Sequence, residues 1–281
     1  MNTGQSFTPD ALDLAPLPSK NLEQRRHQIY PVLCEDDLRH VRQYAEARRY
    51  SDGEAVFEAG QPSPAVLFIL RGELLLLRHD GFGARQAMAL LGRGQFSGEE
   101  GQLAGRPAME DALAVGALEV LALSSDALRT LLVAQAELGE RIVRAMILRR
   151  VALIQRNSGG PVIIAPHGHP GIRDLERFLS SNGHPYSLHD PALDAAAAAM
   201  AKRLRAGPED WPLVICPRST PKRNPSLAEL GRCIGLLQDC VPGKLWDVAV
   251  VGGGPAGLAT AVYAASEGLS VVVLETFSYG G

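Results

Sequence analysis

The segment WDVAVVGGGPAGLATAVYAASEGLSVVVLETFSYGG (Trp246–Gly281) contains a strand–helix–strand pattern. An apolar run, Val248–Val251, leads into a glycine-rich turn. A stretch of small residues then continues to about Glu267 and precedes a second apolar run, Val271–Leu274. Neither apolar run alternates with polar residues, which is typical of parallel strands that helices cover on both faces. The segment therefore predicts a βαβ unit.

The turn after the first strand has the spacing GxGxxG of a dinucleotide-binding loop. Gly252 permits a tight turn, Gly254 lacks a Cβ and lets the backbone approach a pyrophosphate, and Gly257 lets the helix pack closely on the strand. The start of the helix offers free N–H groups to phosphate oxygens. Glu275 follows the second strand, where a carboxylate can accept hydrogen bonds from ribose hydroxyls. The predicted cofactor-binding residues are Gly252, Gly253, Gly254, Pro255, Ala256, Gly257 and Glu275. The alternative is a glycine-rich turn in an ordinary α/β unit.

Within this segment, DVAVVGGGPAGLA followed by VVVLE resembles the start of the FAD domain in flavoprotein disulfide reductases of the thioredoxin reductase type. The closing Tyr279-Gly280-Gly281 is similar to the GGQ stretch near the flavin in that family. The resemblance implies an NADPH-dependent thioredoxin-disulfide reductase, in which the glycines hold the FAD pyrophosphate and the acid holds its adenosine ribose. In that family electrons pass from NADPH through FAD and a redox CxxC to a disulfide substrate of the thioredoxin type.

In that family the CxxC and the NADPH domain come later in the chain. We therefore expect residues 245–281 to be a partial Rossmann-type βαβ unit from a truncated FAD domain. We expect FAD to bind weakly or not at all, and the chain to be inactive alone. Two parallel strands and one helix cannot cover their own apolar faces. The unit is expected to be unpaired at its sheet edges, and either mobile, docked on a neighbour or prone to associate.

From Ala47 to about Leu123, short apolar runs are separated by glycine turns, as in AVLFILRGELLLLR (residues 65–78). Such spacing predicts a small antiparallel β-barrel of the jelly-roll type. Residues 125–155 carry apolar residues at helical spacing, which predicts one helix capped by Ser124 or Ser125.

Residues 30–156 resemble the cyclic nucleotide-binding domain of catabolite-activator-type regulators and kinase regulatory subunits, through GQFSGE (residues 94–99). This motif is similar to GDFxGE, the start of the family's phosphate-binding cassette. The resemblance implies that Gly98 and neighbouring N–H groups receive a phosphate, and that Glu99 takes the ribose 2′-hydroxyl. The predicted residues of this pocket are Gly98, Glu99 and Arg106.

The family's phosphate-clamping arginine has no counterpart at its usual position. Ala108 and Met109 stand nine and ten residues after Glu99. The nearest arginine is Arg106, seven residues after the glutamate. The acidic pair Glu110-Asp111 follows, and it would repel an anion unless the carboxylates point away. We therefore favour a degenerate pocket over ordinary binding of cAMP or cGMP, and leave another small ligand open.

Residues 161–240 predict a small α/β unit of alternating strands and helices. The strands are expected at 162–164, 186–188 and 213–215, and the helices at 171–182, 192–206 and 226–237. The first half resembles a glutaredoxin or thioredoxin-like domain, in which the loop His167–Pro170 stands where the family has its CPxC nucleophile. Trp211-Pro212 resembles the family's cis-proline before the third strand. Without a thiolate in the loop, no dithiol exchange is expected there.

The four cysteines of the chain are Cys34, Cys216, Cys233 and Cys240. They lack CxxC spacing, and we interpret them as reduced cytosolic thiols rather than as a disulfide framework or a zinc site. Cys216 is predicted to be a small buried apolar residue. The middle unit also carries His167, His169, His184 and His189. These are predicted to be polar loop residues and not metal ligands, because no carboxylate or thiol spacing supports a metal site.

The net charge of −3 and the hydrophobic content of 46% are ordinary for a globular protein and give no general attraction to nucleic acid. No apolar run approaches the length of a membrane span, and the polar N-terminus does not resemble a signal peptide. No helix-turn-helix pattern follows residue 155, which disfavours DNA binding. We expect a cytoplasmic homodimer with no nucleic-acid or membrane partner.

These patterns predict a multi-domain chain. Its parts are a flexible arm at 1–29, a cyclic nucleotide-binding-like barrel with helices at 30–156, a thioredoxin-like α/β unit without CxxC at 161–240, and a partial Rossmann-type unit at 245–281. The order resembles bacterial fusions of a sensor domain with a thioredoxin-reductase-like enzyme. Our first hypothesis is the regulatory N-terminal part of such an oxidoreductase. The alternative is a sensor or interaction module without catalysis.

Overall fold

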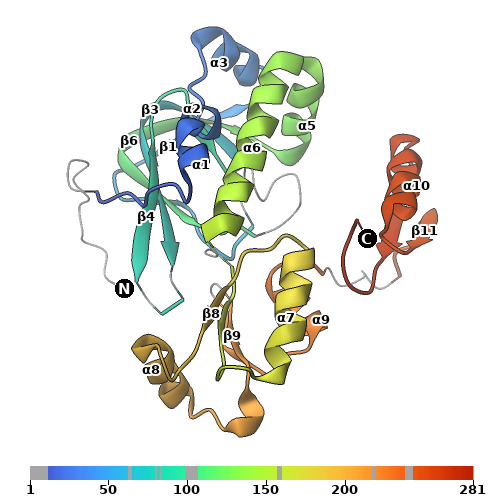
Figure 1. Cartoon of the computed structure of the whole chain (residues 1–281). Coiled ribbons are helices and arrows are strands. Elements are labelled where there is room, and N and C mark those ends of the chain that lie inside the picture. Colours follow the sequence, from blue (N-terminus) through green and yellow to red (C-terminus); the bar gives the residue numbers. More distant parts are fainter. Residues whose placement is uncertain are drawn as a thin grey trace.

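The computed structural model describes residues 12–62, 65–79, 81–82, 84–98, 107–156, 160–216, 219–237 and 243–280. These residues form three sheets of six, four and two strands, each with its own helices (Figure 1). Among them, no helix combines the length and the apolar character needed to cross a bilayer.

The first sheet is the predicted antiparallel β-structure. Its strands are β1 (Glu46–Tyr50), β2 (Ala55–Phe57), β3 (Val66–His79), β4 (Arg85–Leu91), β5 (Phe96–Ser97) and β6 (Asp111–Leu123). The strand order is β1-β6-β3-β4, with β2 paired to β6 and β5 paired to β3. All these pairings are antiparallel, which confirms the predicted arrangement.

Residues 66–69 of strand β3 are apolar without alternation because both faces of the strand are buried there. Leu67 and Ile69 belong to the core inside the barrel. Val66 and Phe68 alternate with them and pack in a second core, which includes residues of the helices that follow β6. A strand covered on both sides loses the period-two pattern of a half-exposed strand.

Three helices flank the barrel: α3 (Glu35–Arg42), α5 (Ser125–Ala134) and α6 (Ala136–Arg156). The Ser124 hydroxyl accepts a hydrogen bond from Ala127 N at 3.3 Å, which confirms one of the two predicted caps. The single helix predicted at 125–155 is wrong, because the chain breaks it at Gln135. A Cβ on Gly139 would lie 2.8 Å from Leu132 O, so this glycine permits the tight turn between α5 and α6.

The flexible arm predicted at 1–29 is wrong for its described part. Residues 20–24 and 26–29 form the short helices α1 (Lys20–Gln24) and α2 (Arg26–Ile29). Their side chains Leu22 and Ile29 are buried against Leu148 and Ala152 of α6. Two well-spaced apolar side chains therefore anchor a segment whose composition is otherwise that of a linker. Residues 1–11 lie outside the described part of the chain.

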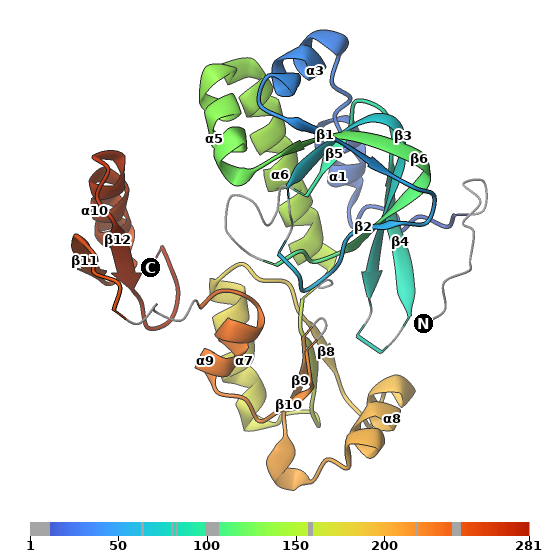
Figure 2. The ribbon, with the colours of Figure 1, turned by 180° about the vertical axis from the view of Figure 1, so that it is seen from behind.

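The second sheet forms the core of the predicted α/β unit. Its elements are β7 (Val162–Ile164), α7 (Pro170–Ser181), β8 (Ser187–His189), α8 (Ala195–Leu204), the 3₁₀ turn η2 (Pro208–Asp210), β9 (Leu213–Ile215), β10 (Lys222–Arg223) and α9 (Leu227–Cys233). The strand order is β10-β9-β7-β8, with β8 parallel and β9 antiparallel to β7. Helices α7 and α9 cover one face and α8 the other (Figure 2). The predicted strands and helices are confirmed with shifts at their ends, and the Trp211–Pro212 peptide bond is cis, as predicted.

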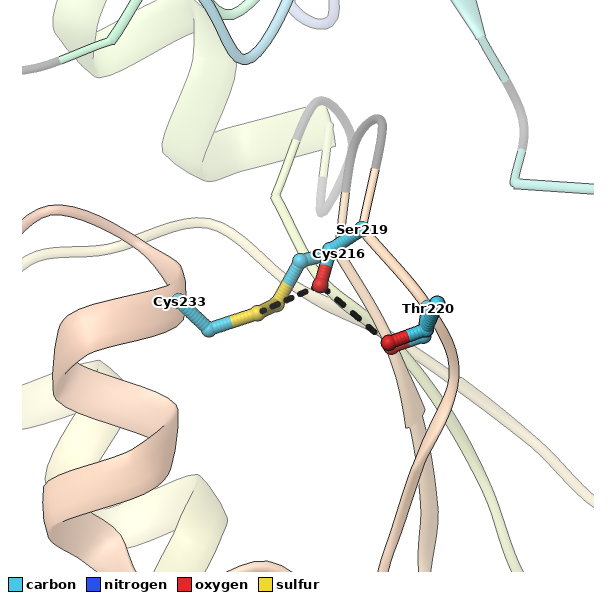
Figure 3. The surroundings of a disulfide bond; sticks show 4 residues. All are labelled: Cys216, Ser219, Thr220 and Cys233. Atoms are coloured by element: carbon cyan, nitrogen blue, oxygen red, sulfur yellow. Dashed lines mark hydrogen bonds between the residues drawn. A yellow bond between two sulfur atoms is a disulfide. The ribbon is translucent and has the colours of Figure 1, made fainter.

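The interpretation of all four cysteines as reduced thiols is wrong, because Cys216 and Cys233 form a disulfide (Figure 3). Cys216 follows β9 and is 2% exposed, as a buried residue should be. Cys233 ends α9 on the same face of the sheet. The fold therefore brings together two thiols that lie 17 residues apart in sequence. Cys34 is free and exposed, and Cys240 lies outside the described residues.

The third sheet is the predicted βαβ unit, composed of β11 (Val248–Val251), α10 (Pro255–Ser266) and β12 (Val271–Leu274). The two strands are parallel, with Val248 opposite Val271 and Val251 opposite Leu274. Within the described residues these strands pair only with each other, and α10 has no buried residue. The expectation of unpaired sheet edges is confirmed for this part of the chain.

Replacing both bonded cysteines (Cys216→Ala with Cys233→Ala) is expected to lower the free energy of unfolding of the middle unit by about 3 kcal/mol. The reason is that the bond closes a loop of 17 residues and restricts the unfolded chain. Urea titration followed by Trp211 fluorescence, in a Trp246→Phe background, measures the effect. Cys34→Ser, which changes a free exposed thiol, is the matched control. A double variant as stable as this control would contradict the expectation.

Candidate functional site

The glycine loop between β11 and α10 has the geometry that the fingerprint predicts. Gly252 has a φ of +96°, a conformation that favours glycine. A Cβ on Gly257 would lie 2.0 Å from Gly252 O and 3.2 Å from Val250 Cγ1. The close packing of the helix on the strand therefore requires glycine at this position. A Cβ on Gly254, by contrast, would meet no atom within 4 Å. The space beside Gly254 is therefore open to a ligand.

Glu275 holds the glycine loop in place. Its Oε2 accepts a hydrogen bond from Gly253 N at 2.6 Å, and its Oε1 accepts from Thr276 N at 2.7 Å and Phe277 N at 2.9 Å. These backbone bonds, that from Gly253 first, lower the pKa of the Glu275 carboxyl to about 2. The carboxylate is partly exposed to solvent, with lone pairs left for a ribose hydroxyl.

The segment after Glu275 folds back over the same loop. Gly280 N donates to Gly253 O at 2.8 Å, and a Cβ on Gly253 would lie 2.7 Å from Tyr279 Cδ1. Phe277 packs edge-on against Phe178 of α7, with ring centroids 5.9 Å apart. Its carbonyl accepts a hydrogen bond from Asn182 Nδ2 at 3.0 Å. The unit is therefore docked on the middle unit, one of the three outcomes expected for it.

The barrel contains a pocket between its strands and α6. Its apolar wall includes Leu76 and Leu153, and it is also bordered by Leu17 of the arm and by Tyr30, which follows the arm. Burial raises the pKa of the Tyr30 hydroxyl, and nearby Arg149 opposes this rise. Because Leu17 of the arm borders the pocket, the arm partly covers it.

Three arginines border this pocket, Arg78 from β3 and Arg149 and Arg156 from α6. Burial, followed by the charge of Arg78, lowers the pKa of Arg156. Arg156 Nη2 donates to the carbonyls of Ala15, at 3.2 Å, and of Pro16 in the arm. An anion in this place would reduce the repulsion between the guanidinium groups.

The two acidic residues after Met109 have different surroundings. Glu110 borders the pocket and forms an ion pair with Arg78. Asp111 accepts hydrogen bonds from Ala59 N at 2.8 Å and forms a 2.7 Å contact with His79 Nε2. The first carboxylate is thus neutralised by its partner, and the second is held by groups of the barrel wall.

Of the predicted pocket residues, Gly98 borders the pocket and has a φ of +89°. Glu99 and Arg106 lie outside the described residues. Met109, which stands where the family has its arginine, also borders the pocket. The three bordering arginines were not predicted, although Arg149 and Arg156 stand seven residues apart, on one face of α6.

In the middle unit, the loop His167–Pro170 lies at the start of α7, as predicted. His169 Nδ1 accepts a hydrogen bond from Gly171 N at 3.2 Å and caps the helix. A Cβ on Gly171 would lie 2.9 Å from Pro212 Cδ, so the cis-proline packs beside the start of α7. The remaining histidines have separate partners: His184 lies 2.9 Å from Pro185 O and His189 lies 2.7 Å from Asp194 Oδ2. Within the described residues, no group of three potential metal ligands comes together.

Two stretches of the chain match protein-family models. Residues 47–135 match the cyclic nucleotide-binding domain, and residues 247–281 match an FAD binding domain. The barrel and its helices thus have the cyclic nucleotide-binding type of fold. No curated protein matches the chain.

Solved structures similar to the chain include the catabolite activator protein of Thermus thermophilus, at 26% identity and a TM-score of 0.39. That match covers 44% of this chain and 58% of the Thermus protein, so it spans little more than half of that protein. A cyclic nucleotide-binding domain from Methylobacillus flagellatus matches at 22% identity and a TM-score of 0.37, covering 47% of this chain and 78% of that one. The N-terminal domain of a transcriptional regulator from Streptomyces coelicolor matches at 22% identity and a TM-score of 0.36, covering 45% and 88%.

The hydrogen bonds of Glu275 give the glycine loop a dependence on pH. Because the folded pKa is about 2, below the ordinary 4.5, the ionised carboxylate stabilises the loop fully above pH 4.5. This stabilisation is lost as the pH falls from 4.5 towards 2. The amide proton signal of Gly253 in an NMR titration is expected to move with a midpoint near pH 2. The movement should vanish in Glu275→Gln, and a midpoint near 4.5 would contradict the assignment.

Proposed function

We propose that this chain contains the regulatory part and the start of the flavin site of a thioredoxin-reductase-like, NADPH-dependent disulfide oxidoreductase. The observation that carries the proposal is the glycine loop, in which Gly257 is required by packing while Gly254 faces open space. The match of residues 247–281 to an FAD binding domain supports the same cofactor.

The residues of the loop fit the ADP half of FAD. The pyrophosphate would lie beside Gly254, where the first N–H groups of α10 are available and no side chain caps the helix. Glu275, ionised at neutral pH, would accept hydrogen bonds from the adenosine ribose. When bound, FAD supplies the two-electron chemistry. The part played by these residues is to bind and orient the adenosine end.

The middle unit supports the same proposal as a thioredoxin-like neighbour of the flavin unit. Its strand order, the cis-proline before β9 and the contact of Pro212 with the start of α7 fit a thioredoxin-like arrangement. The loop His167–Pro170 lacks cysteine. We therefore assign this unit a docking role rather than dithiol exchange at that loop.

Gly254→Ala is expected to weaken FAD binding at least tenfold without loss of fold, because the new methyl fits the free chain but fills the space for the pyrophosphate. ADP should compete with FAD, and riboflavin, which lacks the ADP half, should not. Isothermal titration of the whole chain measures all three ligands.

Two variants serve as controls for this titration. Val262→Ala changes an exposed residue of α10 and should bind like the parent. Gly257→Ala should instead disrupt the unit, because its Cβ collides with Gly252 O. FAD binding that survives Gly254→Ala unchanged, or riboflavin binding as tight as FAD, would contradict the proposed site.

We also propose that the barrel is a sensor for a small anionic ligand. Three arginines and one acid, Glu110, border its pocket, so the net charge of these four side chains favours an anion. The match of residues 47–135 to the cyclic nucleotide-binding domain supports a ligand-binding role for the same pocket. Arg156 is bonded to arm carbonyls, and an anionic group would compete with them for its guanidinium.

A panel of cAMP, cGMP, pyrophosphate and citrate tests the sensor proposal by thermal shift, in a Gly254→Ala background that removes binding at the glycine loop. At least one anion is expected to raise the unfolding temperature. At tenfold excess over its Kd the gain is about 1.4 kcal/mol. Arg156→Met should abolish the shift, and Arg129→Met, at an exposed arginine of α5, should retain it. If no anion stabilises the chain, or if both variants respond alike, the pocket is not an anion site.

A further inference from the structure

The Cys216–Cys233 disulfide is partly accessible to reagents in solution. Cys216 is buried among apolar side chains between the sheet and helices α7 and α9. Cys233 is half-buried at the end of α9, and its sulfur lies 3.9 Å from the Ser219 hydroxyl (Figure 3). Both Ser219 and its neighbour Thr220 are exposed. One sulfur of the bond therefore faces a polar, open edge of the unit, while the other is enclosed.

A second observation connects this bond with the barrel. Beyond Cys233 the chain turns at Gly235, whose φ is +69° and whose Cβ would lie 2.5 Å from Pro107 Cδ. Cys233 and Ile234 border a small cavity together with Pro107, Ala108 and Met109. Ala108 and Met109 also border the arginine-lined pocket of the barrel. The end of α9 thus contacts residues 107–109, the segment before β6, which also borders the barrel pocket.

We propose that Cys216–Cys233 is a thiol–disulfide exchange site for a dithiol reductant, and that its redox state is transmitted to the barrel pocket through Gly235 and Pro107. The inference concerns a different bond from the flavin chemistry proposed above and does not rest on it. It also differs from the loop at the start of α7, where the sequence places no cysteine.

The exchange balances in two steps. A thiolate of the dithiol attacks Cys233 Sγ, the accessible sulfur, and forms a mixed disulfide as the Sγ–Sγ bond breaks. Cys216 leaves and takes a proton, because its apolar surroundings favour the neutral thiol. The second thiol of the reductant then attacks the reductant's first sulfur, which is bonded to Cys233 in the mixed disulfide. This closes a disulfide within the reductant and releases Cys233, which is protonated by solvent. The reductant becomes a disulfide, and the chain gains two thiols.

The consequence for the barrel follows from the position of Cys233. With the bond intact, the last turn of α9 is fixed to the end of β9 and pressed against Pro107. Once the bond opens, this turn is held only by its packing and backbone hydrogen bonds, such as that from Ile234 N to Leu230 O at 3.1 Å. Contact with residues 107–109 then weakens, and with it one wall of the ligand pocket.

The first experiment counts thiols in the native whole chain, in a background of Cys34→Ser and Cys240→Ser. Dithiothreitol in native buffer, removed before a maleimide–polyethylene glycol is added, is expected to give one label per chain, at Cys233, because Cys216 is buried, and omission of the reductant none. Circular dichroism confirms that the chain remains folded. If no label appears until denaturant is added, the bond is a structural crosslink and the exchange site is refuted.

The second experiment measures hydrogen exchange of a peptide covering residues 107–110, before and after reduction. Exchange is expected to be faster in the reduced chain than in the oxidised chain. The double variant Cys216→Ser with Cys233→Ser should exchange at the rate of the reduced chain, whether or not reductant is present. Gly235→Ala should speed this exchange in the oxidised chain, because its Cβ displaces Pro107. Gly243→Ala is the matched control, since Gly243 has a φ of +79° but no neighbour within 4 Å. Reduction without any change at 107–110 would overturn the coupling to the barrel.

Discussion

The buried guanidinium of Arg149 ties the N-terminal arm, the barrel and the long helix α6 together. Its Nε donates to Ile29 O at 2.9 Å and its Nη1 donates to Phe96 O at 3.0 Å. Its central carbon lies 5.1 Å from the ring centre of Tyr30 and 4.8 Å from that of Phe96. A buried charge without such partners would cost several kcal/mol. These contacts hold α6 in its register on the barrel, and the same register places Arg156 at the barrel pocket.

The same helix connects the barrel to the middle unit. Arg150, next to Arg149, donates to Gly183 O at 2.6 Å, just beyond α7. On the other side, Phe82 of the β3–β4 hairpin packs edge-on against His189 of β8, with ring centres 4.9 Å apart. Together with the contact of Gly235 on Pro107, these contacts join the two units at three separated points. The barrel and the middle unit therefore pack directly against each other.

Local sequence signals predicted most of the secondary structure, but not the long-range pairings. The glycine loop, the cis-proline and the strand positions depend on neighbouring residues, and the sequence predicts each of them. The disulfide was missed because Cys216 and Cys233 approach only when β9 and α9 pack on one face. The arm was assigned as flexible because two apolar side chains do not reveal the groove on α6 that buries them. The arginines of the pocket were overlooked for the same reason, since their burial depends on tertiary packing.

The βαβ unit shows that local constraints can specify a site with little hydrophobic burial. Val251 is 85% exposed and Val262 67% exposed, so hydrophobic burial contributes little to its order. Its shape is set instead by short-range terms: the Gly257 approach to Gly252 O, the three backbone bonds accepted by Glu275, and the bond from Gly280 N to Gly253 O. These interactions all converge on the loop between β11 and α10. A phosphate cradle of this kind can therefore be preorganised by its own backbone, while the exposed faces of β11 and α10 leave room for further packing partners.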